Sequence, residues 1–192
     1  MGISTAGECV IEKMLLFYSN PNFLRVILEI PHDGKHVSLR LLDHFVTNYT
    51  KNPDTRVWIN KCDIYDDYKN MLNGYSKNLF DPFCRDERIV LFAVNDKGEK
   101  LSFENDRKQI LKMKKVNLIY ELRNNDNTYN DGIITTIAQL HFFSWCIQRN
   151  VIQYVLAHST KIQDSMPKNN KKGQIKNKKI IYKKEMKFRI EF

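Results

Sequence analysis

Apolar and polar residues alternate along residues 23–30, and this period of two predicts a β-strand. The apolar positions of the segment are Leu24, Val26, Leu28 and Ile30. Residues 31–34, which read Pro-His-Asp-Gly, then carry the signals of a turn. The first dozen residues show no clear period, so we expect them to form an arm or a frayed start.

Helical spacing of apolar residues appears later, near residues 38–50, 63–73, 135–149 and 151–165. Ser38 and Asp63 precede the first two segments as candidate N-caps. Pro53 is expected to end the first of these helices, and Gly74 the second. The third segment is apolar on most sides, which is typical of a buried helix at the centre of a core.

Further strands are predicted at residues 55–60, 88–94 and 101–103, with a hairpin turn at residues 95–98. Residues 116–122 fit either another strand or the end of a helix that begins near Glu104. Together these elements predict a single α+β domain, in which a small, largely antiparallel sheet packs against about four helices.

Charge is concentrated at the end of the chain. Residues 167–192 hold ten basic and two acidic side chains, so they carry +8 of the net charge of +9. The sequence therefore divides into a nearly neutral globular domain at residues 1–166, a basic Lys/Asn-rich loop at residues 167–185, and residues 186–192. In this last segment apolar and polar residues alternate, which predicts a C-terminal strand that docks on the domain.

The basic side chains are the candidate binding residues, because lysine and arginine neutralise phosphates or pair with carboxylates. The candidates are Lys168, Lys171, Lys172, Lys176, Lys178, Lys179, Lys183, Lys184, Arg85 and Arg88. Arg85 and Arg88 lie in a dense corner at residues 80–88, where Asp81 and Pro82 predict a turn and Phe80 and Phe83 are expected to bury. The expected partner is a nucleic acid, DNA or RNA, or the acidic surface of another protein.

No catalytic, metal or cofactor site is predicted. The four cysteines form no CxxC pair and no glycine-rich phosphate loop is present, so we expect free thiols and no nucleotide-hydrolysing loop. Asp63, Asp66 and Asp67 are expected to form a solvated helix N-terminus, and His44 and His141 to be hydrogen-bonded histidines at the edge of the core. No apolar run is long enough to span a bilayer, and no membrane partner is expected.

Three stretches carry a resemblance to a known group of proteins. They read SLRLLDHFVTNY at residues 38–49, YSK and FDPFCR at residues 75–77 and 80–85, and TTIAQLHFFSW at residues 135–145. With these stretches the chain resembles a family of short, poorly characterised proteins of the giant viruses, the nucleocytoplasmic large DNA viruses. The resemblance implies a viral origin, which agrees with a composition rich in Lys, Asn and Ile, and it implies no catalytic residue.

Charge and resemblance together predict a non-enzymatic giant-virus protein that binds nucleic acid through its basic C-terminal segment, in genome packaging or expression. A virion structural component, such as a minor capsid protein, is the first alternative, because a Lys-rich loop also suits an acidic protein surface. An enzyme with an unrecognised site is the second. The expected location is the viral factory in the host cytoplasm, with the virion as a further location.

Overall fold

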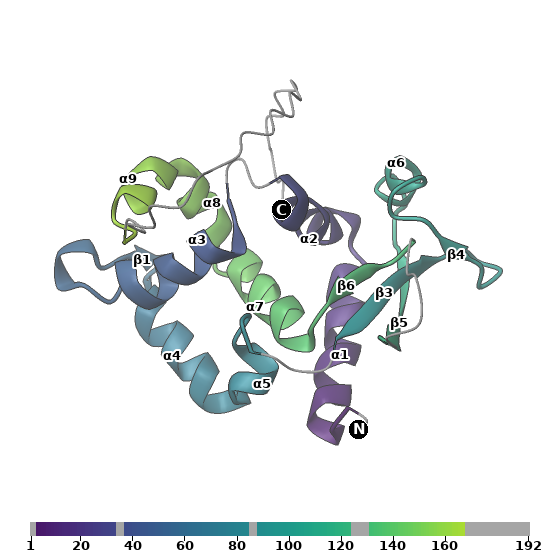
Figure 1. The fold of residues 1–192 in the computed structure, drawn as a ribbon, viewed down its shortest axis with the longest axis horizontal. Helices are drawn as coiled ribbons and strands as arrows, with labels where there is room; N and C mark the ends of the chain where they lie inside the picture. The colour runs from purple at the N-terminus through teal and green to yellow at the C-terminus, as the bar shows by residue number, and fades with distance from the viewer. Residues whose placement is uncertain (1–2, 34–36, 85–87, 124–130, 168–192) are drawn as a thin grey trace, which may run out of the picture.

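Helix α7 (Ile137–Gln148) runs through the middle of the molecule, and other helices cover most of its surface (Figure 1). The structure is a computed structural model that describes residues 3–33, 37–84, 88–123 and 131–167. The Thr136 side chain accepts a hydrogen bond from the Gln139 amide and caps the helix. Ten of the twelve residues of α7 are buried, as its apolar sequence predicts.

Two N-terminal helices replace the arm and the strand that the sequence pattern predicts. Helix α1 (Thr5–Tyr18) is capped by Ser4 and buries Val10, Ile11 and Met14. The Tyr18 hydroxyl donates a hydrogen bond of 2.7 Å to the Leu140 carbonyl, which fixes α1 to α7. The prediction of a frayed start is therefore wrong, because this segment has an apolar helical face that α7 covers.

Residues 23–30 lie in helix α2 (Pro21–Asp33), so the predicted strand is wrong and the predicted turn is partly helix. Leu24, Ile27 and Leu28 are buried, and their spacing of three and four residues is helical. Leu24 and Leu28 also fit an alternating strand, whereas the burial of Ile27 fits only the helix. Asn20 and Pro21 decide between the two periods. The Asn20 side chain accepts from the Asn22 amide, and Pro21 occupies the first turn, where a missing N–H costs nothing.

The middle of the chain forms a series of short elements: α3 (Leu39–His44), a π-helix (Phe45–Tyr49), a 3-10 turn (Pro53–Thr55), β1 (Trp58–Ile59), β2 (Cys62–Asp63), α4 (Ile64–Tyr75) and α5 (Lys77–Phe80). The predicted caps are confirmed, because Ser38 accepts from the Leu41 amide and Asp63 from the Asp66 amide. Gly74 does not end α4, which continues to Tyr75. Ser76 stops it with a φ of 65°.

The larger sheet has β3 (Ile89–Val94) as its central strand, and all its pairings are antiparallel. One edge of β3 pairs with β5 (Asn117–Leu122), and the other is shared by β4 (Lys100–Leu101) and β6 (Ile133–Thr135). The hairpin turn at residues 95–98 is confirmed. Gly98 adopts a φ of 80°, and its amide donates to the Asn95 carbonyl. Residues 117–122 are thus a strand, and helix α6 (Arg107–Ile110) ends before them.

The helical segment after Asn150 is broken in two, as α8 (Val151–Ala157) and α9 (Ser159–Asp164). The break lies at His158, whose backbone leaves the helical region with φ −121° and ψ 19°. The single helix predicted over residues 151–165 is therefore wrong in its continuity, although Val151, Val155 and Ile162 are buried as expected.

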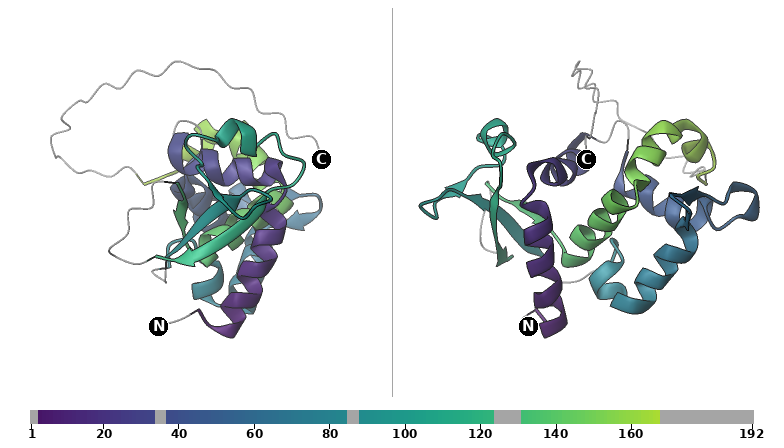
Figure 2. Two further views of the ribbon diagram at one scale, coloured as in Figure 1. Left: turned by 90° about the vertical axis from the view of Figure 1, so that its right-hand side faces the viewer. Right: turned by 180° about the vertical axis from the view of Figure 1, so that it is seen from behind.

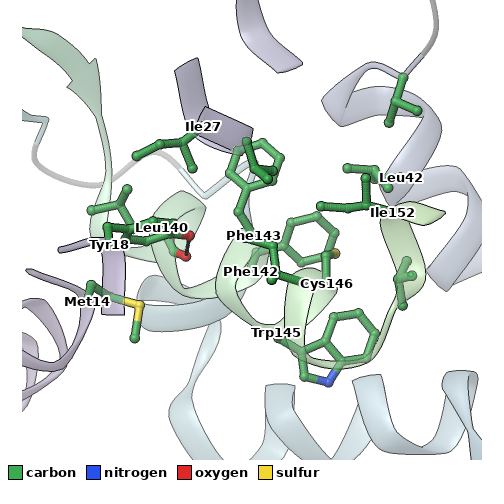
Figure 3. Packing of buried hydrophobic residues seen from close by; sticks show 14 of the residues in the cluster. Met14, Tyr18, Ile27, Leu42, Leu140, Phe142, Phe143, Trp145, Cys146 and Ile152 are labelled. Carbon is green, nitrogen blue, oxygen red and sulfur yellow. Dashed lines mark hydrogen bonds between the residues drawn. The ribbon is translucent and has the colours of Figure 1, made fainter. Parts of the chain in front are cut away.

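The apolar core joins α1, α2, α3 and α8 to α7, and Figure 3 shows Tyr18, Ile27, Leu42 and Ile152 around Phe142 and Phe143. Sheet and helices share this core, so the α+β class and the small antiparallel sheet are confirmed, with more helices than the four predicted. Among the described residues, no helix combines the length and apolar character needed to cross a bilayer.

None of the four cysteines, all of which the structure describes, forms a disulfide, and Cys146 is buried within the core. Burial raises the pKa of the Cys146 thiol well above its ordinary value, because a thiolate would be poorly solvated there. We therefore expect a reducing agent to leave the melting temperature unchanged in a thermal melt followed by circular dichroism. A lower melting temperature on reduction would reveal a disulfide and contradict this structure.

Candidate functional site

Most of the residues predicted to bind a partner lie outside the described residues. These are Arg85 and the lysines at positions 168, 171, 172, 176, 178, 179, 183 and 184. The predicted C-terminal strand at residues 186–192 also lies outside them. Arg88 is described: it is exposed, directly before β3, and lines a pocket of about 240 Å³ with Thr135, Thr136 and Gln139.

The corner at residues 80–84 is built as a turn, as predicted, but only one of its two phenylalanines is buried. Phe80 is fully buried, whereas Phe83 is 52% exposed, so the expectation for Phe83 is wrong. The Asp81 carboxylate accepts from the Phe83 amide, and the Asp81 carbonyl accepts from the Cys84 amide. This turn directs the Phe83 side chain away from the core. The Pro82 carbonyl accepts from the Gln139 side chain and anchors the corner to α7.

The three stretches that carry the family resemblance meet in space. The His141 ring on α7 lies 2.9 Å by its Nδ1 from the Leu79 carbonyl, and its centroid is 4.4 Å from the Tyr75 ring. Burial lowers the pKa of His141, so the ring is neutral at pH 7. Asp43 on α3 belongs to the same unit. Burial raises the pKa of its carboxyl, and the nearby charge of Asp81 raises it further. These contacts give the stretches a shared structural role.

A polar cleft of about 470 Å³ opens between α3, the π-helix and the end of α9. It is lined by Arg40, Asp43, His44, Asn48, Tyr49, Asn52, Thr55, Ser165, Met166 and Pro167. The Ser165 hydroxyl donates to the Ile162 carbonyl at 2.6 Å, so the hydrogen bond of 2.9 Å to His44 must be donated by the ring Nε2. A histidine that donates to a serine does not activate it as a nucleophile.

The His44 side chain is thus a hydrogen-bonded histidine at the edge of the core, as the sequence predicts for both His44 and His141. Burial lowers the pKa of His44, and the neighbouring Arg40 charge lowers it further. Both rings are neutral at pH 7. The cleft therefore offers polar groups for binding rather than an arranged acid–base pair.

The acidic residues at the start of α4 are paired with arginines. Arg56 contacts Asp63 and Asp66, each at 2.6 Å, and its guanidinium lies 5.9 Å from the exposed Trp58 ring. Asp67 accepts from the Trp145 indole N–H at 2.7 Å and from two nitrogens of Arg149. The start of α4 is therefore less solvated than expected. Within the described ranges, no group of three or more His, Cys, Asp or Glu side chains is arranged to hold a metal ion.

The Asp67 carboxylate joins α4 to the second half of α7 and to Arg149 just beyond it. Burial raises the pKa of Asp67, but hydrogen bonds from Arg149 and Trp145 outweigh burial and hold the pKa below its ordinary value. Replacing Asp67 with alanine leaves the buried Trp145 N–H without its acceptor. We expect a loss of about 2 to 3 kcal/mol in the free energy of unfolding.

Urea denaturation measures this loss, and Asp66→Ala is the matched control. The Asp66 side chain is 61% exposed and bonds Arg56 at the surface, so its removal should cost about 0 to 1 kcal/mol. Equal losses for the two variants would show that Asp67 makes no special contribution.

A second basic segment, which the sequence pattern did not single out as a binding surface, spans α6 and the connection to β5. Residues 107–115 hold five basic side chains, and no acidic residue follows them before Glu121. We call the set Arg25, Arg107, Lys108, Lys112, Lys114 and Lys115 the basic loop surface. A count of charge in short windows would have found residues 107–115. Averaging over residues 1–166, with a net charge of only +1, concealed them.

These observations define a small α+β protein in which the described residues form one core with a polar cleft and a basic loop surface. One relative of this protein comes from a giant virus. The "Family of unknown function (DUF7197)" matches residues 4–110 and 103–188, and the chain belongs to this family. It is similar to the "Uncharacterized protein L507" of Acanthamoeba polyphaga mimivirus, with 31% identity over 176 residues.

The alignment covers 87% of this chain and 56% of the mimivirus protein, so the chain spans about half the length of this relative. The predicted resemblance to proteins of giant viruses is thereby confirmed. No solved structure matches the chain.

Proposed function

We propose that this protein binds nucleic acid through its basic C-terminal segment and acts in the packaging or expression of a giant-virus genome. The observation that carries the proposal is the segregation of charge, with +8 of the net +9 in residues 167–192. Each phosphate that a lysine neutralises releases condensed counterions, and this release drives binding to DNA or RNA. The lysines of residues 167–185 supply most of these contacts, with Arg85 and Arg88 extending them.

The proposal assigns no reaction to the protein. Its partner is DNA or RNA, and a protein that handles the viral genome belongs in the viral factory of the host cytoplasm. It would enter the virion if it is packaged with the genome. A minor capsid component, whose basic loop meets an acidic protein surface, uses the same charge with a different partner.

Gel-shift titrations with duplex DNA and with RNA at ~50 mM salt test the proposal, since phosphate contacts are strongest at low salt. A shift with either nucleic acid is expected, and its absence with both would overturn the proposal. Mass spectrometry of purified virions addresses the alternative. Absence of the protein from virions would remove the capsid role, whereas its presence without any gel shift would favour that role.

A further inference from the structure

Helix α6 and the loop that follows it, which carry most of the basic loop surface, lie at the far end of the molecule from α4 and the β1–β2 hairpin, next to the sheet (Figures 1 and 2). This surface is a second concentration of positive charge, separate in sequence from residues 167–185. Its lysines at 108, 112, 114 and 115 are all exposed, and Arg25 is exposed on α2. Glu104 and Asp106 precede the run, and the Asp106 carboxylate accepts from the Ser102 amide.

The loop that carries these charges is held by its own apolar residues. Ile110 and Val116 are fully buried, and Leu111 and Met113 pack against the core. The apolar side chains thus point inward and leave the lysines at the surface. Because the backbone of this loop is already ordered, the loop loses less conformational entropy when a partner binds.

Hydrogen bonds fix the loop at both ends. The Leu111 amide donates to the Arg107 carbonyl at 3.0 Å, and the Met113 amide donates to the Ile110 carbonyl at 3.2 Å. At the far end the Val116 amide donates to the Ser19 carbonyl at 2.8 Å, which ties the loop to the junction of α1 and α2.

Arg107 joins the loop to α2. Its guanidinium lies 3.6 Å from the Glu29 carboxylate, and Glu29 is only 9% exposed. Arg25 precedes Glu29 by one helical turn and therefore lies on the same side of α2. The Glu29 carboxylate offsets the Arg107 charge, so the positive charge of this surface comes mainly from the four exposed lysines of the loop and from Arg25 on α2.

We propose that the basic loop surface is a second contact for the phosphate backbone of a nucleic-acid duplex. The composition favours nucleic acid over protein, because lysine is depleted at protein interfaces, whereas lysine–phosphate contacts dominate non-specific binding to duplexes. The apolar residues of the loop point to the core, so the loop lacks the apolar centre that a protein interface uses. This inference rests on the proposed function and adds a duplex-binding surface to it.

The test compares two variants with the same loss of charge. The loop variant replaces Lys108, Lys112, Lys114 and Lys115 with glutamine. The control variant replaces Lys51, Lys61, Lys69 and Lys77 with glutamine. These lysines are also exposed, but they belong to α4, α5 and the connections around β1, away from α6 and the loop after it. Both variants keep residues 167–192 intact. Fluorescence anisotropy with a labelled duplex at ~0.15 M salt reports the affinity.

Each phosphate contact contributes a slope of about −0.9 to log affinity against log salt concentration, so the loss of one contact should weaken binding by about fivefold at ~0.15 M salt. If three or four of the loop lysines contact phosphates, the loop variant should bind the duplex at least about 100-fold more weakly than the wild type. The control variant should lose less than about threefold in affinity. Equal effects in the two variants, or none in either, would overturn the inference. If the wild-type protein still binds the duplex in that case, the proposed function stands without the second contact. If the wild-type protein does not bind, both the proposed function and this inference fail.

A second measurement needs no variant. Lysine-reactive labelling of the wild-type protein, read by mass spectrometry, should show protection of Lys112, Lys114 and Lys115 by the duplex. Lys69 and Lys77 should remain as reactive as in the free protein. Unprotected loop lysines in a fully bound sample would contradict the inference. Poly-glutamate that displaces the duplex at equal charge concentration would assign the surface to an acidic protein partner instead.

Discussion

Replacing Phe143 with alanine is expected to lower the free energy of unfolding by about 3 to 5 kcal/mol. Phe143 is 4% exposed in the middle of α7, and its ring packs beside Phe142 with the centroids 6.1 Å apart. Figure 3 shows it pointing into the space between α7 and Ile27 of α2. Truncation removes this buried ring and leaves a cavity that the surrounding helices cannot close, because α1, α2 and α8 also pack against α7.

Urea denaturation of the purified variant measures the loss, and Phe83→Ala is the matched control. Phe83 is 52% exposed, so the same truncation there should change the free energy by less than about 0.5 kcal/mol. A Phe143→Ala protein as stable as the wild type would show that α7 is not the centre of the core.

The second large effect concerns the basic C-terminal segment. Replacing Lys171, Lys172, Lys178 and Lys179 with glutamine should flatten the dependence of log affinity on log salt by about three to four units. Each neutralised phosphate of a duplex contributes a slope near −0.9, so the removal of four lysine–phosphate pairs accounts for this change. Fluorescence anisotropy with a labelled duplex over a series of salt concentrations measures both slopes.

The segment 186–192 is retained in this variant, because its alternating apolar positions predict a strand that belongs to the fold. A thermal melt that matches the wild type confirms that only binding has changed. An unchanged slope in a folded variant would remove these four lysines from the binding surface.

Local signals predicted the helices in which an N-cap residue stands directly before a clear apolar helical period; α1 has its cap, Ser4, but was missed because its apolar period was not recognised. Ser38, Asp63 and Thr136 each accept a backbone amide three residues on, so cap and helix lie in one short stretch of sequence. Helix α2 was missed because Leu24 and Leu28 fit both periods, and the Asn20 and Pro21 start signal was needed to decide. The register of β3 with β5 and β6 depends on contacts far apart in the chain, which no local pattern specifies.

The same distinction applies to the candidate site. The lysines of residues 167–185 follow from composition alone, and Arg107 to Lys115 would follow from a shorter window. The partners of Asp67 could not be predicted from the local sequence, because Trp145 and Arg149 lie 78 and 82 residues further along the chain. The His44 contact with Ser165 spans 121 residues and is equally invisible in the sequence. Long-range contacts of this kind appear only once the core brings the helices together.

The salt dependence of wild-type binding to a labelled duplex, followed by anisotropy from ~50 mM to ~500 mM salt, tests the central claim most directly. The four lysines replaced above account for a slope of roughly −3 to −4 in log affinity against log salt, and three or four contacts from the basic loop surface would steepen it to roughly −6 to −7. Binding at ~50 mM that disappears at ~500 mM is the predicted result. A slope near zero, or no binding to DNA or RNA at ~50 mM salt, would contradict nucleic-acid binding through the basic segment.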